Sequence, residues 1–240
     1  MNYHSVLLLI SFLITGCTPT QSTQPVALTP TPTITSAPTI TFTQTPINLP
    51  PGKEIIFESS GGKDFTGTAY GEGKTVILLA NMSIGGEKQW NPFVAVVDKH
   101  RFTTITFDYR NINDVNPDMD LVHNWFKRVG FTRVICIGAS LGTRACSHIA
   151  LEPEIVGMVL IAGSVHHATV AEATYPKLLI AGALDRWAFD IKNGYQTASE
   201  PKTLVLFENN RVHGTDLFHS KDSEQFLTML INFVNGVANP

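Results

Sequence analysis

Short, mostly apolar runs alternate with segments of helical periodicity along the chain beyond Gly52. The first two runs predict a leading hairpin, whereas the middle runs are apolar at almost every position. Uninterrupted apolar runs are typical of parallel strands that are covered on both faces. We therefore predict β-strands over residues 55–58, 65–70, 75–80, 103–107, 134–137, 158–162, 178–181 and 203–207.

Helices are predicted between these strands. The tripeptide Asn116-Pro117-Asp118 offers a capping residue followed by proline at the first helical position, and Gly130 can end that helix. Apolar residues recur at the spacing of one helix face in this segment and near the C-terminus: Leu121, Val122, Trp125, Phe126 and Val129, then Phe226, Leu227, Leu230, Ile231 and Val234. Strands that alternate with helices predict a doubly wound, mostly parallel α/β sheet. Ligands of such sheets bind beyond the carboxyl ends of the strands.

The N-terminus has the features of an export signal. Residues 6–14 form an apolar run that is too short to span a bilayer but has the length of a signal-peptide core. The following Ile14-Thr15-Gly16-Cys17 resembles the lipobox of bacterial lipoproteins. The resemblance implies removal of residues 1–16, lipid attachment to Cys17 and an extracytoplasmic protein anchored to a bacterial membrane. Because Asn2-Tyr3-His4 lacks Lys and Arg, an ordinary secretory signal or a buried N-terminal segment remains the alternative.

Residues 17–52 are predicted to be a tether. The segment consists mostly of Thr and Pro, and few of its residues could contribute to a core. Frequent X-Pro steps favour extended backbone, so we expect a semi-rigid spacer that begins at the lipidated Cys17. The folded domain is then expected over residues 53–240.

Composition agrees with one folded domain plus these appendages. Of the 240 residues, 43% are hydrophobic and 15% are charged, which suits a globular chain with a core. A net charge of -3 implies no broad basic surface, so we expect no nucleic-acid partner. The three cysteines do not form a disulfide framework. We interpret Cys136 and Cys146 as small buried hydrophobes, although a bridge between them would suit an exported protein.

The segment after the predicted strand 134–137 carries candidate chemistry. Gly138-Ala139-Ser140-Leu141-Gly142 is a Gly-x-Ser-x-Gly pattern, and a helix is predicted from Thr143. In a tight turn between a strand and a helix, such a serine is lifted above the sheet edge and the flanking residues must be small. Ser140 is therefore our candidate nucleophile.

Two further residues complete a candidate triad. Asp185 follows the predicted strand 178–181, and His213 follows the predicted strand 203–207. A serine hydroxyl needs an imidazole to take its proton, and a carboxylate to hold that imidazole in the correct tautomer. The chain order Ser140, Asp185, His213 is the order that α/β-hydrolases use.

On these residues the chain resembles the α/β-hydrolase superfamily, above all its compact dienelactone-hydrolase-like and esterase-like members. The landmarks of the resemblance are residues 75–81, 107–110, 137–142, 178–185 and 212–218. The resemblance implies acyl-enzyme chemistry with no metal or organic cofactor, and an oxyanion hole that uses the backbone N–H of Leu141. Many members carry His-Gly after the first central strand, where this chain has Asn81-Met82-Ser83. Met82 or Ser83 is expected to supply the second N–H.

Only about fifteen residues separate the predicted strands 158–162 and 178–181, where related enzymes insert a lid. We therefore expect an α/β-hydrolase fold with little or no lid, and an open site for a small-molecule acyl substrate. The hypothesis is a carboxylesterase-like serine hydrolase. A peptidase or amidase with the same triad, and a non-catalytic binding module on this fold, are the alternatives. No metal-ligand motif is recognised, and the oligomeric state stays open.

Overall fold

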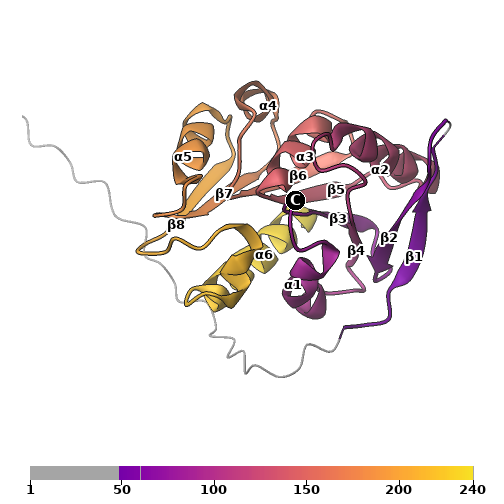
Figure 1. Cartoon of the computed structure of the whole chain (residues 1–240), viewed down its shortest axis with the longest axis horizontal. Coiled ribbons are helices and arrows are strands. Elements are labelled where there is room, and N and C mark those ends of the chain that lie inside the picture. Colours follow the sequence, from indigo (N-terminus) through magenta and orange to yellow (C-terminus); the bar gives the residue numbers. More distant parts are fainter. Residues whose placement is uncertain (1–48, 60, 240) are drawn as a thin grey trace, which may run out of the picture. The chain divides into compact units, whose positions relative to one another are not determined.

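The computed structural model of the chain describes residues 49–59 and 61–239, so Cys17, the predicted signal peptide and most of the tether lie outside it. Eight strands form one sheet in the order β1-β2-β4-β3-β5-β6-β7-β8 (Figure 1). The β1–β2 and β2–β4 pairs are antiparallel, and all other pairs are parallel. The strands are β1 (Lys53–Phe57), β2 (Phe65–Tyr70), β3 (Thr75–Ala80), β4 (Phe102–Phe107), β5 (Val134–Ala139), β6 (Ile155–Ile161), β7 (Lys177–Gly182) and β8 (Lys202–Phe207).

Helices cover both faces of the sheet (Figure 1). One face is covered by α2, α3, α4 and α5, and the other by α1 and α6 together with two short 3-10 helices. The helices are η1 (Glu87–Trp90), α1 (Asn91–Val96), α2 (Asn116–Val129), α3 (Leu141–Ile149), α4 (His167–Glu172), α5 (Ala188–Thr197), η2 (Gly214–His219) and α6 (Ser223–Ala238).

Each central strand contributes to two apolar cores because successive side chains point to opposite faces of the sheet. On β3, Val76 and Leu78 pack beneath α2 and α3, whereas Ile77 and Leu79 pack towards α1 and α6. All four side chains are fully buried. The apolar runs of the sequence therefore correspond to strands that are covered on both sides, and the predicted doubly wound sheet is confirmed.

The predicted elements agree closely with the observed ones, with small differences at their ends. β6 begins at Ile155 rather than at residue 158, and α3 begins at Leu141 rather than at Thr143. Gly130 ends α2 in the left-handed conformation (φ 88°), as its lack of a side chain allows. The capping role expected for Asn116 is wrong, because this residue is the first of the helix and Val115 precedes it as the cap, with no side-chain capping bond.

The interpretation of Cys136 and Cys146 as separate buried hydrophobes is also wrong. Cys136 on β5 and Cys146 on α3 form a disulfide, with Cα atoms 5.7 Å apart. Both residues are fully buried in the core beneath α2 and α3. The bridge joins the strand before Ser140 to the helix after it, so the bonded loop encloses the Gly-x-Ser-x-Gly segment.

The strand order reverses next to β3, and this reversal positions the site. From β3 the chain moves to β4 through α1 on one face, then returns past β3 to β5 through α2 on the other face. The segments that leave β3 and β5 therefore diverge to opposite faces, and ligands of open α/β sheets bind at such a reversal, beyond the carboxyl ends of the strands. Ser140 follows β5 and Asn81 follows β3, so both residues lie at this reversal.

Candidate active site

Ser140 occupies a strained turn between β5 and α3. Its φ of 51° and ψ of -109° are rare for a residue with a side chain. The N–H of Ser140 donates to the carbonyl oxygen of Ile161 at 2.8 Å, and the N–H of Thr143 donates to the carbonyl oxygen of Ser140 at 3.1 Å. Hydrogen bonds to β6 and α3 thus hold the unusual backbone from both sides.

Three glycines allow the surrounding backbone to approach this turn. A Cβ on Gly138 would lie 2.1 Å from the carbonyl oxygen of Gly142, and a Cβ on Gly142 would lie 2.1 Å from that of Ala80. A Cβ on Gly163, after β6, would lie 2.4 Å from the carbonyl oxygen of Ser140. These distances are far below van der Waals contact, so the close packing of β3, β5, α3 and β6 requires glycine at all three positions.

The three candidate triad residues meet in one chain of hydrogen bonds. The Nε2 atom of His213 lies 2.8 Å from the Oγ atom of Ser140. On the other side of the ring, Nδ1 of His213 lies 2.8 Å from Oδ2 of Asp185. With Nδ1 protonated, His213 donates to the carboxylate and leaves Nε2 free to accept the proton of the Ser140 hydroxyl.

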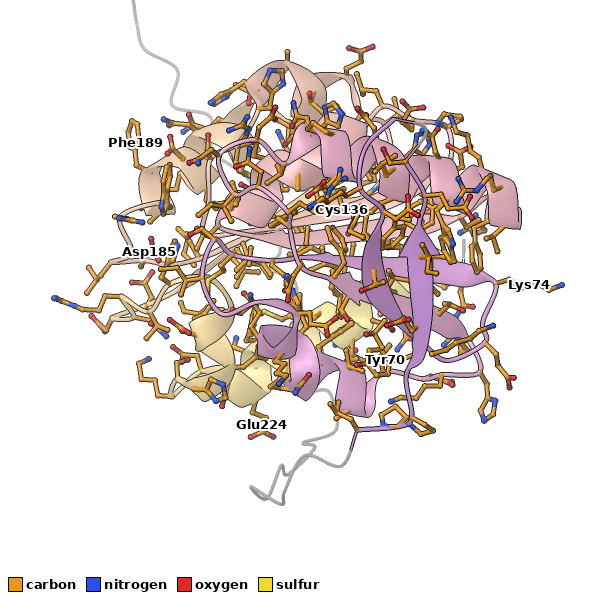
Figure 2. The ribbon with its side chains drawn as sticks, turned by 45° about the vertical axis from the view of Figure 1, so that its right-hand side comes forward. Tyr70, Lys74, Cys136, Asp185, Phe189 and Glu224 are labelled. Carbon is orange, nitrogen blue, oxygen red and sulfur yellow. A yellow bond between two sulfur atoms is a disulfide. The ribbon has the colours of Figure 1, made fainter. Side chains whose placement is uncertain are left out.

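Asp185 is fixed and desolvated, whereas His213 is partly exposed to solvent. The Asp185 side chain is only 1% exposed and the His213 side chain is 27% exposed. The second carboxylate oxygen of Asp185, Oδ1, accepts the backbone N–H of Trp187 at 2.7 Å. This bond sets the rotation of the carboxylate and keeps Oδ2 facing His213. In Figure 2, Asp185 lies at the carboxyl ends of the strands, on the opposite side from Lys74, which precedes β3.

The loop that follows β3 is held by side chains with clear structural roles. The amide of Asn81 is buried, donates to the backbone oxygen of Phe107 and to Oδ1 of Asp108, and accepts from the indole N–H of Trp90. Asp108 also accepts the backbone N–H of Glu87 at 2.7 Å. Asn81 and Asp108 therefore fix the two ends of the loop, and Trp90, which is fully buried, belongs to the core.

The two candidate second donors of an oxyanion hole differ in their hydrogen bonding. The backbone N–H of Met82 donates to Oε1 of Gln89 at 3.2 Å. Within residues 49–59 and 61–239, no hydrogen bond is found for the backbone N–H of Ser83 or of Leu141. Leu141 and Ser83 therefore keep N–H groups that a ligand oxygen could bind.

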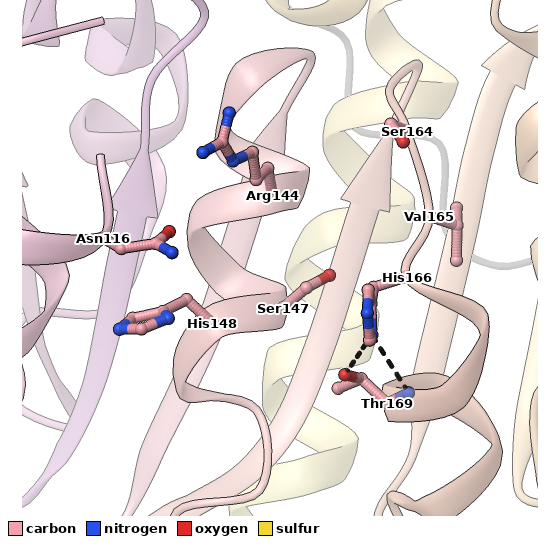
Figure 3. A pocket seen from close by; sticks show the side chains of 8 residues that line it. All are labelled: Asn116, Arg144, Ser147, His148, Ser164, Val165, His166 and Thr169. Carbon is pink, nitrogen blue, oxygen red and sulfur yellow. Dashed lines mark hydrogen bonds between the residues drawn. The ribbon is translucent and has the colours of Figure 1, made fainter. Parts of the chain in front are cut away.

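A cavity of about 470 Å³ lies beside α3 (Figure 3). No triad residue lines it, although Thr143 connects it to the turn at Ser140. The hydroxyl of Thr143 lies 2.8 Å from the carbonyl oxygen of Ser140 and 2.7 Å from that of Ser164. The lining residues are Asn116, Arg144, Ser147, His148, Ser164, Val165, His166 and Thr169.

A separate group of titratable side chains lies at the other end of the strands, where their amino ends are. His123 on α2 is joined to Glu154 in the turn before β6, with 2.8 Å between Nε2 and Oε2, and Glu152 lies nearby. The hydrogen bond from His123 lowers the pKa of Glu154. Because the turn before β6 is remote from the carboxyl ends of the strands, these residues take no part in the site around Ser140.

Several solved structures are similar to this chain over most of its length. No protein-family model and no curated protein sequence matches the chain. A dienelactone hydrolase from Anabaena variabilis is similar at a TM-score of 0.66 and 16% identity, over 79% of this chain and 99% of that one. The esterase domain of a Rhodothermus marinus protein has a TM-score of 0.65 at 15% identity, over 78% and 98% of the chains. An esterase from Pyrococcus furiosus has a TM-score of 0.65 at 12% identity, over 84% and 99%.

This chain has the α/β-hydrolase fold. Its segment between β6 and β7, where a lid would be inserted, carries only the six-residue helix α4. None of the helices in the described part of the chain combines the length and the hydropathy needed to cross a bilayer.

Some residues around the site gave no signal in the sequence. Gln89 hydrogen-bonds both the loop after β3 and the segment after His213, yet it stands in an ordinary polar stretch. Trp187 contributes a backbone N–H, which carries no residue-specific signal. Gly163 could be identified from the sequence only once the packing of β6 beside Ser140 was known.

Proposed function

We propose that the chain is a serine hydrolase that cleaves carboxylic esters or related acyl bonds through an acyl-enzyme intermediate. The observation that carries the proposal is the hydrogen-bond chain from Ser140 through His213 to Asp185, with both distances at 2.8 Å. A structural role does not require a partly exposed serine, an imidazole and a buried carboxylate in this order. Nucleophilic acyl transfer requires all three.

In the first half of the reaction, Oγ of Ser140 attacks the carbonyl carbon while Nε2 of His213 takes the hydroxyl proton. The negative charge that develops on the carbonyl oxygen is bound by backbone N–H groups, with Leu141 as the first donor. The tetrahedral intermediate then collapses, and His213 gives its proton to the leaving alcohol oxygen. Asp185 stabilises the imidazolium that exists between these two proton transfers.

In the second half, a water molecule attacks the acyl carbon of the ester formed on Ser140, and His213 accepts a proton from this water. Collapse of the second intermediate returns the proton to Oγ of Ser140 and releases the carboxylic acid. His213 is partly exposed, which gives water direct access to the imidazole. The segment between β6 and β7 carries only the six-residue helix α4 and so leaves no room for an inserted lid domain, which favours a substrate that approaches from solvent.

A fluorophosphonate probe tests this proposal. We expect the purified chain to gain one phosphonyl group on Ser140, found by intact mass and peptide mapping, and to hydrolyse p-nitrophenyl acetate. The Ser140→Ala variant should gain no adduct, whereas Ser164→Ala, which removes another hydroxyl from this side of the sheet, should be labelled as the wild type is. A wild-type chain that is neither labelled nor active on esters would refute the proposal. Turnover of peptides or amides without ester turnover would move the assignment to an amidase.

We also infer that the protein is exported and held on a bacterial membrane by a lipid on Cys17. The disulfide between Cys136 and Cys146 supports a location outside the cytoplasm, because disulfides persist mainly in oxidising compartments. In a bacterial host, the full chain is expected to incorporate a fatty-acid label and to fractionate with membranes. Cys17→Ser should abolish both properties, and Ser140→Ala should change neither. Labelling that survives Cys17→Ser would contradict the inference.

A further inference from the structure

Gln89 joins the two polypeptide segments that the proposed reaction must hold in register. Its Oε1 atom accepts the backbone N–H of Met82 at 3.2 Å and the hydroxyl of Thr215 at 2.7 Å. Its Nε2 atom donates to the carbonyl oxygen of Gly86 at 2.5 Å. The donors and acceptors around the amide fix its orientation, because a carbonyl oxygen can only accept and a backbone N–H can only donate.

These contacts span the whole loop between β3 and η1. Met82 stands at the start of this loop and Gly86 at its end, where η1 begins. The side chain of Gln89 therefore joins the two ends of the loop. The residues between Met82 and Gly86, including Ser83, form no hydrogen bond with Gln89. The loop is also joined to β4 through Asp108, so its position relative to the sheet is determined at several points.

The third contact reaches the segment that carries the proposed base. Thr215 lies in η2 two residues after His213, and it is buried. Gly214, between them, has a φ of 55°, and a Cβ on it would lie 2.3 Å from the sulfur of Met82. The backbone after His213 therefore packs directly against Met82, and Gln89 adds a hydrogen bond across the same contact.

From this geometry we propose that Gln89 is a positioning residue, which holds the N–H of Ser83 towards the oxyanion and keeps the loop in register with His213. This proposal rests on the function proposed above. Because the N–H of Met82 already donates to Gln89, the second oxyanion donor is then Ser83, with Leu141 as the first. Ser83 and Leu141 both have N–H groups that form no hydrogen bond within the described residues.

Kinetics of four single variants test the proposal, with p-nitrophenyl acetate as the substrate. Gln89→Leu keeps the size of the side chain but removes its hydrogen bonds, so kcat should fall between about 10-fold and 100-fold with KM changed less than about 2-fold, because a misplaced donor weakens transition-state binding above all. Thr215→Val should lower kcat in the same way but less. Thr215→Ser, which keeps the hydroxyl, is the matched control and should stay close to the wild type.

The pH dependence of kcat in Gln89→Glu is a second measurement. A residue that only packs the loop would not produce this dependence. A glutamate keeps an oxygen for Met82 and Thr215, but its ionised carboxylate would face the carbonyl oxygen of Gly86. The kcat of this variant, relative to the wild type at each pH, should therefore recover as the pH falls towards the ordinary pKa of a glutamate, because the protonated acid can donate to Gly86. A pH-independent ratio would contradict the proposal.

The outcomes separate the proposal from its rivals. If Gln89→Leu keeps the wild-type kcat and loses only thermal stability, Gln89 merely packs the loop and the proposal is overturned. If kcat rises, the amide oxygen of Gln89 blocks a donor at Met82 that substrate must reach, and the proposal is again overturned. A wild-type chain without esterase activity or probe labelling would refute the function itself, and that result is distinct from both.

A structure of the phosphonylated enzyme would locate the donors directly. We expect the phosphonyl oxygen on Ser140 to accept from the N–H groups of Leu141 and Ser83, while the bond between Met82 and Gln89 remains. Displacement of Gln89 from Met82 by that oxygen would overturn the assignment of Ser83.

Discussion

Replacing Asp185 by asparagine is expected to lower kcat/KM for ester hydrolysis by about 10⁴-fold while the protein stays folded. The N–H of Trp187 donates to one oxygen of Asp185, so an asparagine would place its own oxygen there and turn its NH₂ group towards Nδ1 of His213. Nδ1 would then have to accept, and the ring proton would move to Nε2. An imidazole in that tautomer cannot take the proton of Ser140. Steady-state kinetics with p-nitrophenyl esters measures the effect.

The matched control is Asp216→Asn, which removes an exposed carboxylate three residues after His213. It should leave kcat/KM within about 2-fold of the wild type, as is usual for a surface substitution. The double variant Ser140→Ala with Asp185→Asn should be no slower than Ser140→Ala alone, because the residues of a triad act as one unit. Equal effects of the Asp185 and Asp216 substitutions would show that general charge, rather than the tautomer of His213, governs the rate.

Those parts of the fold that depend on local pattern could be predicted from the sequence. The eight predicted strands all appear, and β3, β4, β5 and β7 are buried at every position, because a strand covered on both faces needs apolar side chains almost throughout. The turn from Gly138 to Gly142 could be recognised in the sequence because no larger residue fits at its two glycines. Asp185 and His213 follow their strands in a known order, and strand ends at one sheet edge bring such residues together.

Features that depend on contacts between distant segments could not be predicted. Gln89 meets Thr215 only because η1 and η2 pack against each other, and no periodicity in either segment reports that contact. The bond between the backbone N–H of Met82 and Gln89 was equally hidden, since Gln89 stands seven residues further along in an ordinary polar stretch. The disulfide required knowing that Cys136 faces α3 rather than α6. A strand buried on both faces carries no sequence signal for the direction of each side chain.

The site therefore combines a turn defined by local sequence with a loop defined by tertiary contacts. Ser140 is held by its immediate neighbours and by the strands on either side of β5. The loop after β3 instead depends on Asn81, Asp108 and Gln89, whose partners come from β4, η1 and η2. Substitutions in the loop should change how well the transition state is bound, whereas substitutions at the turn should affect whether a nucleophile is presented at all.

Removal of the disulfide between Cys136 and Cys146 should show whether the conformation of the turn at Ser140 depends on this covalent bond. The bridge joins residues ten positions apart in sequence, and closing a loop of this size stabilises the folded state by about 3 kcal/mol according to chain entropy. For a folded domain of this length, we expect Cys136→Ala with Cys146→Ala to lower Tm by about 6–12 °C. Activity at 25 °C should stay within about 3-fold of the wild type, because Ile161, Thr143 and the close contact with Gly163 hold Ser140 without the bridge.

Differential scanning calorimetry, with and without a thiol reductant, measures this effect. Reductant should lower the Tm of the wild type and leave that of the double variant unchanged, and Cys17→Ser should respond as the wild type does. If reduction leaves the wild-type Tm unchanged, Cys136 and Cys146 are not bonded in the protein. If the double variant loses activity at a temperature where it is still folded, the conformation of Ser140 depends on the covalent bridge rather than on the hydrogen bonds and glycine contacts around it.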